Sequence, residues 1–449
     1  LVAMPLGIGL GIGLTRDDDD RDMPIFVTSP TVSPTPGLRT VSPSSPDRGV
    51  IPSESTSSPT FQLTSSPPEI QTSIPTETST DPQTSVPIST SSVPTSATSA
   101  PTPTSTTSAP TPTPTSAPTV PLVDEELFDL LSSVSFDSGA SILDSGSAQN
   151  EAYTWLAGTE NLASLSDSQR IQRYALAALY FSTDGLSWSQ SEGWLTTSDE
   201  CTWFSTGSGE STCDVNGAFI TLDLGFNGLM GTLPPELGLL TGLTRIDLSG
   251  GVGPGIGGAL PDQLSSLTTL EILSLNDNAI TGPLFSEIGV LSDLRILNIK
   301  DNGMTGFLPN EIGDLARLIF MDLSSNGFSG PVPDTVGNLQ NLVTLNIGNN
   351  SFTSIPSSVG NLGSMGTFNA PFNDLTGPLF DDWAGLGGLQ DLDLHSNNLS
   401  GFLPASLGEL GGLLELDLSD NQFSSNIPES YGGLTSVLIL RLNSNQLTG

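Results

Sequence analysis

The chain has 449 residues, and 48 acidic residues against 11 basic ones give it a formal net charge of −37. This charge argues against nucleic acids and anionic membrane surfaces as partners, because binding to phosphate groups requires lysine and arginine. Cations, basic proteins and neutral glycans are compatible with it, and so is a plain role of the acidic residues in solubility.

The first 14 residues, LVAMPLGIGLGIGL, are uncharged and mostly apolar, and TRDDDDRD follows them. A helix needs about 20 apolar residues to cross a bilayer. We interpret residues 1–14 as the end of a transmembrane anchor whose apolar stretch begins upstream, and a signal segment is the alternative. The acidic flank then places the residues that follow on the outer side of the membrane.

Residues 15–121 are rich in serine, threonine and proline, and from Ser99 to Thr119 only Ser, Ala, Pro and Thr occur. Such a segment has too little apolar surface to offset the entropy lost on ordering. We therefore predict a disordered stalk over residues 15–121. Residues 122–166 are expected to be a helical linker before the folded part.

A helix is predicted in SDSQRIQRYALAALYF, where Ser166 or Ser168 caps the start and one face is apolar; this face holds Ile171, Tyr174, Ala175, Ala178 and Leu179. Beyond it lie the two cysteines of the chain, Cys201 and Cys213. No other metal-ligating residues are spaced around them, so the pair fits one disulfide better than a zinc site. A disulfide implies an oxidising compartment.

From about residue 217 to the end, one unit recurs: L-x-x-L-x-L-x-x-N-x-L-x-G-x-L-P-x-x-L-G-x-L. Its asparagine lies at Asn227, Asn278, Asn302, Asn326, Asn350, Asn373, Asn397, Asn421 and Asn445. One further copy, with Gly251 in place of the asparagine, lies between the first two, which makes about ten copies. A repeat of this length indicates a solenoid whose units bury their leucines only by stacking.

The pattern also predicts what each part of a unit does. The x-L-x-L-x segment forms a short parallel strand, about 4.8 Å from the strand of the previous unit, with its leucines in the core. The asparagine amide, which has donors and an acceptor, satisfies backbone groups at the bend. The G-x-L-P segment makes the opposite, tighter side of each turn.

These units resemble the 24-residue plant-type leucine-rich repeat of receptor-like ectodomains, polygalacturonase-inhibiting proteins and microalgal surface proteins. The preceding segment resembles the N-terminal cap of that family at Ala175, Leu176, Leu179, Tyr180, Thr183, Gly185, Trp188, Trp194, Leu195, Cys201, Trp203 and Cys213. The resemblance, which covers about 167–449, implies an α/β solenoid shaped as a horseshoe, with parallel strands on the concave face. The cap would take residues 167–216, and an array that is incomplete at its C-terminal end would take residues 217–449.

The resemblance further implies a recognition module at the cell surface, membrane-anchored or secreted, that binds a protein, peptide or glycan. A structural cell-wall or adhesion protein and an inhibitor of a secreted glycan-degrading enzyme are the alternatives. No nucleophile is paired by a motif with His395, the only histidine, so we expect no enzyme. The sequence predicts no cofactor and no metal site.

Candidate binding residues come from the side chains that flank each buried strand leucine. In the first such row, Ile272, Ile296 and Phe320 are neighbours and are expected to form an exposed apolar patch. The second row is polar throughout and reads Asp223, Asp247, Ser274, Asn298, Asp322, Asn346, Asn369, Asp393, Asp417 and Arg441. This row is typical of the family and also fits a merely solvated surface.

One copy, FNAPFNDLTG, departs from the pattern. Phe368 and Ala370 replace its two leucines, and Pro371, which cannot donate a backbone hydrogen bond, enters the expected strand. Two interpretations stay open. The copy is a tolerated local defect, or it is a kink that pushes Phe372, next to Asn369, outward as an aromatic anchor.

Four carboxylates are predicted to form a grid on two neighbouring strands: Asp391, Asp393, Glu415 and Asp417. Arg441 on the next strand is expected to relieve only Asp417, and the acidic surroundings should favour the protonated form of His395. We hypothesise that this grid receives a cation or a basic segment of a partner, and a repelling but solvated face is the alternative. Asn349 and Asn398 head the predicted N-glycosylation sequences.

Overall fold

The computed structural model describes residues 124–449, except 205–210 and 252. The predicted anchor, residues 1–14, and the predicted stalk, residues 15–121, lie outside the described residues. The chain divides into two units, Leu1–Thr106 and Thr107–Gly449, and every described residue belongs to the second. Among the described residues, no helix has the length and the apolar character needed to cross a membrane.

Four helices open the described part: α1 (Glu125–Val134), α2 (Ala140–Leu143), α3 (Ala148–Ala157) and α4 (Asp167–Ser182). The predicted helix is α4, which begins after Ser166 with a capping box shared with Gln169. Side chains on the two faces of α4 belong to two different hydrophobic cores. Tyr174 and Ala178 pack with α1, α2 and α3, whereas Leu176 and Leu179 pack against the repeats. The helix therefore joins the cap to the array.

The predicted disulfide between Cys201 and Cys213 is confirmed. It ties the 3-10 helix η3 (Glu200–Thr202) to the segment that enters the first repeat, where Cys213 forms an antiparallel bridge with Phe219. Beside it, Arg173 of α4 donates from Nε to Oε2 of Glu200 over 2.8 Å, and both side chains are buried. Trp203 covers the arginine, whose Cζ lies 5.7 Å from the indole centre.

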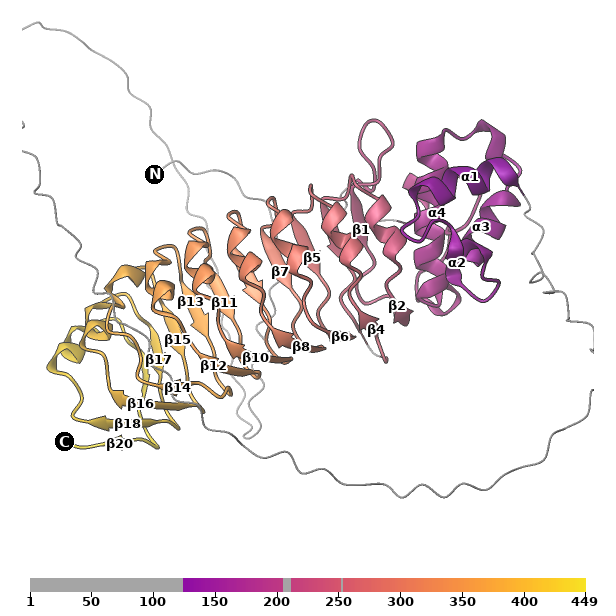
Figure 1. The fold of residues 1–449 in the computed structure, drawn as a ribbon. Coiled ribbons are helices and arrows are strands. Elements are labelled where there is room, and N and C mark those ends of the chain that lie inside the picture. The colour runs from indigo at the N-terminus through magenta and orange to yellow at the C-terminus, as the bar shows by residue number, and fades with distance from the viewer. Residues whose placement is uncertain (1–123, 205–210, 252) are drawn as a thin grey trace, which may run out of the picture. The chain divides into compact units, whose positions relative to one another are not determined.

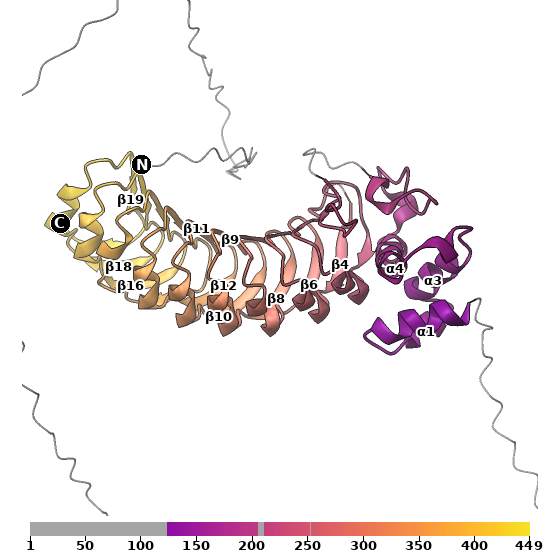
Figure 2. The same ribbon diagram turned by 90° about the horizontal axis from the view of Figure 1, so that it is seen from above.

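The repeats form a ten-stranded parallel sheet in unbroken order. Its strands are β1 (Thr221–Asp223), β3 (Arg245–Asp247), β5 (Ile272–Ser274), β7 (Ile296–Asn298), β9 (Phe320–Asp322), β11 (Thr344–Asn346), β13 (Thr367–Asn369), β15 (Asp391–Asp393), β17 (Glu415–Asp417) and β19 (Ile439–Arg441). Figure 1 shows the array continuing from the helices, and Figure 2 shows this sheet along the concave side, with the short 3-10 helices of the repeats on the other side. The predicted fold class is confirmed.

Further short parallel strands run into the start of the G-x-L-P segments, on the side of each unit for which the sequence predicts only tight turns. These make a six-stranded and a four-stranded sheet. The first holds β2 (Gly231–Thr232), β4 (Ile256–Ala259), β6 (Ala279–Gly282), β8 (Gly303–Phe307), β10 (Gly327–Pro331) and β12 (Ser351–Ser354); the second holds β14 (Thr376–Gly377), β16 (Asn398–Phe402), β18 (Gln422–Ser425) and β20 (Gln446–Leu447).

The break between these two sheets falls after β12, in the copy that is one residue short. Gly306 and Gly330 of the preceding copies have positive φ, whereas Ser354 does not. The pairing of β10 with β12 also shifts between Gly330 and Pro331. The missing residue thus interrupts the outer sheets and leaves the ten-stranded sheet continuous.

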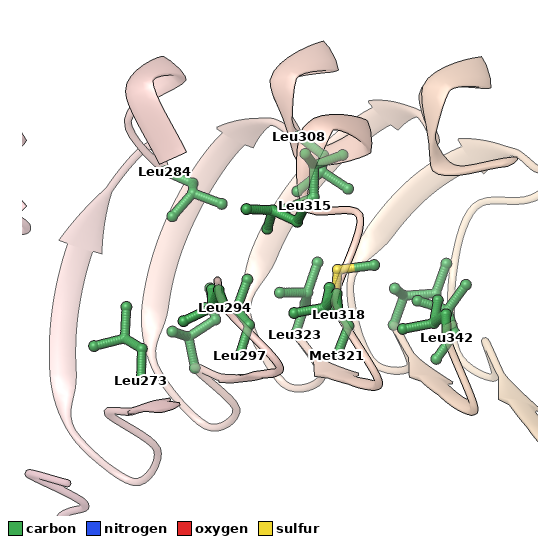
Figure 3. Close-up of a cluster of buried hydrophobic side chains, with 14 of the residues drawn as sticks. Leu273, Leu284, Leu294, Leu297, Leu308, Leu315, Leu318, Met321, Leu323 and Leu342 are labelled. Carbon is green, nitrogen blue, oxygen red and sulfur yellow. The ribbon is translucent and has the colours of Figure 1, made fainter. Parts of the chain in front are cut away.

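Leucines from each unit fill the interior between the sheets, as Figure 3 shows for Leu273, Leu297 and Met321 of neighbouring strands. At each bend the asparagine acts as predicted. In the central copy, Asn326 Nδ2 donates to the carbonyl oxygens of Ile299, Leu323 and Ser324 over 2.9–3.2 Å. Its Oδ1 accepts the backbone N–H of Met304 over 3.0 Å. One amide therefore satisfies backbone groups of two adjacent repeats.

Replacing Asn326 with leucine should destabilise the array around it by at least about 3 kcal/mol, because buried backbone groups that lose their partner cost about 1–3 kcal/mol each. Amide hydrogen exchange at Met304 measures this locally. Asn310→Ala, at an exposed position of the 3-10 helix η7 (Asn310–Asp314), is the control. Unchanged protection of the Met304 amide in the Asn326 variant would contradict the assigned role.

Arg173→Met should lower the melting temperature strongly, because removing one partner of a buried ion pair costs about 3–5 kcal/mol. The double variant Arg173→Met/Glu200→Leu should recover part of this loss, since no buried charge is then left unpaired. Arg317→Met is the matched control: Arg317 lies 2.6 Å from Asp293, its side chain is mostly exposed, and its loss should have little effect. Equal destabilisation by both single variants would count against the buried pair.

Candidate functional site

The concave face of the ten-stranded sheet carries two aligned rows of side chains. The middle residue of each strand points into the core, and the first and third residues point outward. The first row runs through Thr221, Arg245, Ile272, Ile296, Phe320, Thr344, Thr367, Asp391, Glu415 and Ile439, which are paired in register from strand to strand. Unbroken pairing makes this face one continuous surface.

Three predicted residues of the first row, Ile272, Ile296 and Phe320, are neighbours in register on β5, β7 and β9. They are half-buried, whereas the repeat pattern predicted that they would be exposed. The adjacency holds, and the accessible apolar surface is smaller than expected, because neighbouring strands and side chains cover part of each residue.

A shallow groove beside this apolar stretch was not found from the sequence. It is lined by Glu271, Arg295, Arg317, Ile319, Asn341, Val343 and Ser364. Its arginines are paired, since Arg295 lies 3.6 Å from Glu271 and Arg317 lies 2.6 Å from Asp293. Four of these residues stand one position before a strand of the ten-stranded sheet: Glu271, Arg295, Ile319 and Val343. Comparing this position from repeat to repeat is the sequence signal that could have indicated the groove.

The irregular copy keeps its place in the sheet. β13 pairs in register with β11 and β15, and Phe368 and Ala370 are fully buried. Pro371 does not interrupt the ladder, because the backbone N–H at this position is not used for strand pairing in the other copies. There it donates to the side chain two residues earlier, as Ser324 does to Asp322 over 3.0 Å.

The proline nevertheless has a local consequence. Asn369 lies where Asp322 lies in its own copy, and the N–H that would pair with its side chain is absent at Pro371. Asn369 Oδ1 is accordingly buried without a hydrogen-bond partner. The carbonyl oxygen of Pro371 still accepts the N–H of Asn349 over 2.8 Å, as the ladder requires.

Phe372 points outward, with 57% of its surface exposed, but the predicted kink is not the reason. Its φ is +51°, and the equivalent residues of other copies, among them Ser325 at +54° and Ser396 at +53°, have the same left-handed conformation. The regular bend therefore presents Phe372. Its ring packs edge to face against His395, with 4.7 Å between the ring centres.

The four predicted carboxylates lie in register on β15 and β17: Asp391 beside Glu415, and Asp393 beside Asp417. Arg441 contacts both residues of β17, with Nη1 2.6 Å from Glu415 Oε1 and 3.0 Å from Asp417 Oδ2. The expectation that Arg441 relieves only Asp417 is therefore wrong. Its side chain is long enough to span the first and third positions of the neighbouring strand.

Asp417 is less outward than expected. Only 5% of its surface is exposed, and its Oδ1 accepts the backbone N–H and the hydroxyl of Ser419. The carboxylate is fixed by these bonds and by Arg441. The expected row of four solvated acids is thus a partly buried network.

His395 follows β15 and pairs with Asp393. Its Nδ1 lies 2.6 Å from Asp393 Oδ1, and its backbone N–H donates to the same oxygen over 3.0 Å. The hydrogen bond to Asp393 raises the pKa of the imidazole against the opposing effect of burial, and the charges of Asp393, Asp417 and Asp420 raise this pKa further. The predicted preference for the protonated form agrees with this direction.

Ligating atoms of Asp393, His395 and Asp417 lie within 4.8 Å of one another. The carboxylates of this group also bond to His395, Ser419 and Arg441, so they already take part in charge pairing. The glycosylation candidates lie apart: Asn349 is exposed at a bend beside the concave face, and Asn398 begins β16 on another sheet. Their occupancy stays a prediction.

Known proteins support the repeat assignment. A family model described as a leucine-rich repeat region matches residues 263–376, and one described as leucine rich repeat matches residues 383–448. No curated protein matches the chain.

The solved structures similar to it include two complexes of plant proteins. The ectodomain of the plant membrane receptor kinase GASSHO1/SCHENGEN3 from Arabidopsis thaliana, in complex with Casparian strip integrity factor 2, is 34% identical with a TM-score of 0.54; the match covers 57% of this chain and 30% of that one. The complex PEPR1–AtPEP1 is 28% identical with a TM-score of 0.51, and the match covers 61% and 41%. The chain thus spans less than half the length of either relative. With its ten stacked units and its disulfide-bonded cap, the chain contains a leucine-rich-repeat array and is similar to the leucine-rich-repeat ectodomain of a plant receptor kinase.

Proposed function

We propose that this protein is a recognition module that binds an extended peptide or protein segment across the concave face, and that it acts by binding and not by catalysis. The observation that carries the proposal is the unbroken register of the ten-stranded sheet, which aligns an apolar stretch and an acidic end on one surface. Both structures named above are complexes. One holds the GASSHO1/SCHENGEN3 ectodomain with Casparian strip integrity factor 2, and the other holds PEPR1 with AtPEP1; these complexes support a binding role here.

The spacing defines the ligand. The apolar stretch ends at β9 and the acidic end begins at β15, three strand intervals away, or about 14 Å. An extended chain covers that distance in about four residues. We therefore propose a segment with apolar residues and, about four residues further along, a basic residue.

The excess of acidic residues would steer such a segment toward the face. The disulfide between Cys201 and Cys213 supports a cell-surface or secreted location. Anchoring by residues 1–14 remains part of this proposal.

Display of random peptides on the full chain tests the proposal. Enriched peptides should combine apolar and basic residues at about the stated spacing. Their affinity should fall about fivefold with either Asp391→Asn or Glu415→Gln, the effect of one unit charge about 4 Å away in a waterlike dielectric. Ile296→Thr should weaken the same peptides through the apolar stretch.

Glu311→Gln and Asp334→Asn are the matched controls, since both are exposed and lie on 3-10 helices η7 and η8 (Asp334–Asn338) away from the concave face. They remove the same kind of charge and should leave affinity unchanged. Peptides that lose equal affinity with the control variants, or a display that enriches none, would sink the proposal.

A further inference from the structure

The concave face contains one group that changes its charge near neutral pH, and that group is the only histidine of the chain. His395 lies between β13 and β17 at the acidic end. It is held from one side by Asp393, at 2.6 Å, and from the other by the ring of Phe372, at 4.7 Å between ring centres. Only about a quarter of its side chain is exposed.

The charged groups that face His395 are mostly acidic. Its own strand contributes Asp391 and Asp393, and the neighbouring strand and bend contribute Glu415, Asp417 and Asp420.

From β19 comes Arg441, which is bonded to Glu415 and Asp417. From β13 and the bend after it come Asn369, Pro371 and Phe372, none of which titrates. Protonated His395 is therefore a second cation at the acidic end of the face, beside Arg441.

We propose that His395 is a proton-operated switch of the concave face, which rests on the function proposed above. As an imidazolium it is clamped by Asp393 and offsets part of the surrounding negative charge. When it loses its proton, Arg441 alone faces Asp391, Asp393, Glu415 and Asp417, and the face binds basic ligand groups more tightly. The switch regulates affinity without moving the backbone.

The direction of the switch follows from the same contacts. The hydrogen bond to Asp393 and the nearby carboxylates raise the pKa of His395 above its ordinary 6.5. Its contribution to folding stability is thus fully present below the unfolded pKa and is lost as the pH rises through the folded one. Basic ligands gain affinity over the same pH range, as the pH rises through the pKa of His395 in the folded protein.

Nuclear magnetic resonance titration of the full chain tests the clamp directly, because one histidine gives one imidazole signal. We expect a titration midpoint above 6.5 in the unaltered protein. Asp393→Asn should move the midpoint down, and Asp334→Asn, a carboxylate far from the face, should not. A midpoint at or below 6.5, or a midpoint that Asp393→Asn does not change, overturns the inference. This test involves no ligand, so its outcome does not depend on the proposed function.

Binding of an oligo-arginine peptide at about pH 5.5 and about pH 9 tests the consequence, since ordinary carboxylates stay ionised over this interval. Affinity should rise about fivefold with pH in the unaltered protein, the effect of one unit charge. His395→Gln should abolish most of that rise. An equal rise in the variant, or no oligo-arginine binding at either pH, overturns the switch, whereas the wider function is decided separately by the peptide display.

Discussion

The asparagine amide at each bend is the interaction on which the rest of the structure depends. From Asn278 onward, these asparagines each bond backbone groups of their own repeat and of the previous one, as Asn326 and Asn350 do. Because each bend is fixed to the one before it, strands stack in constant register, and the residue before each asparagine takes a left-handed conformation. That conformation is what presents Phe372 beside His395.

A second set of bonds shapes the acidic row. The third residue of several strands accepts the backbone N–H two positions on, as Asp247, Asp322, Asp393 and Asp417 do. These side chains close the turn after the strand, which accounts for the recurrence of Asp and Asn in this row. Like charges on neighbouring strands are tolerated because each carboxylate already has a local donor.

The solenoid was predicted from the repeat spacing, the cap helix α4 from a capping serine and its apolar face, and the disulfide from the presence of only two cysteines. The outer sheets were not predicted, since their strands carry glycine, serine and threonine, which resemble turn residues. Among the candidate residues, Asp391 and Asp393 have the predicted neighbours, Glu415 and Asp417. The contact of Arg441 with Glu415 was missed, and the kink, one of two interpretations left open for the irregular copy, is not what exposes Phe372. Side-chain reach and bend conformation are not visible in a one-dimensional pattern.

The two rows of the concave face differ in how free they are to carry recognition. A second-row residue such as Asp322 or Asp417 accepts the backbone N–H two positions on, so its identity is restricted to short acceptors. The first row includes Thr344, Asp391 and Ile439, which differ widely in size and charge. Ligand specificity should therefore reside in the first row and at bend positions such as Phe372 and His395, while the second row supplies a fixed negative background. If the ligand changes during evolution, substitutions at Ile272, Ile296 or Asp391 can follow that change. Such substitutions leave intact the asparagine bonds at the bends, which hold the array together.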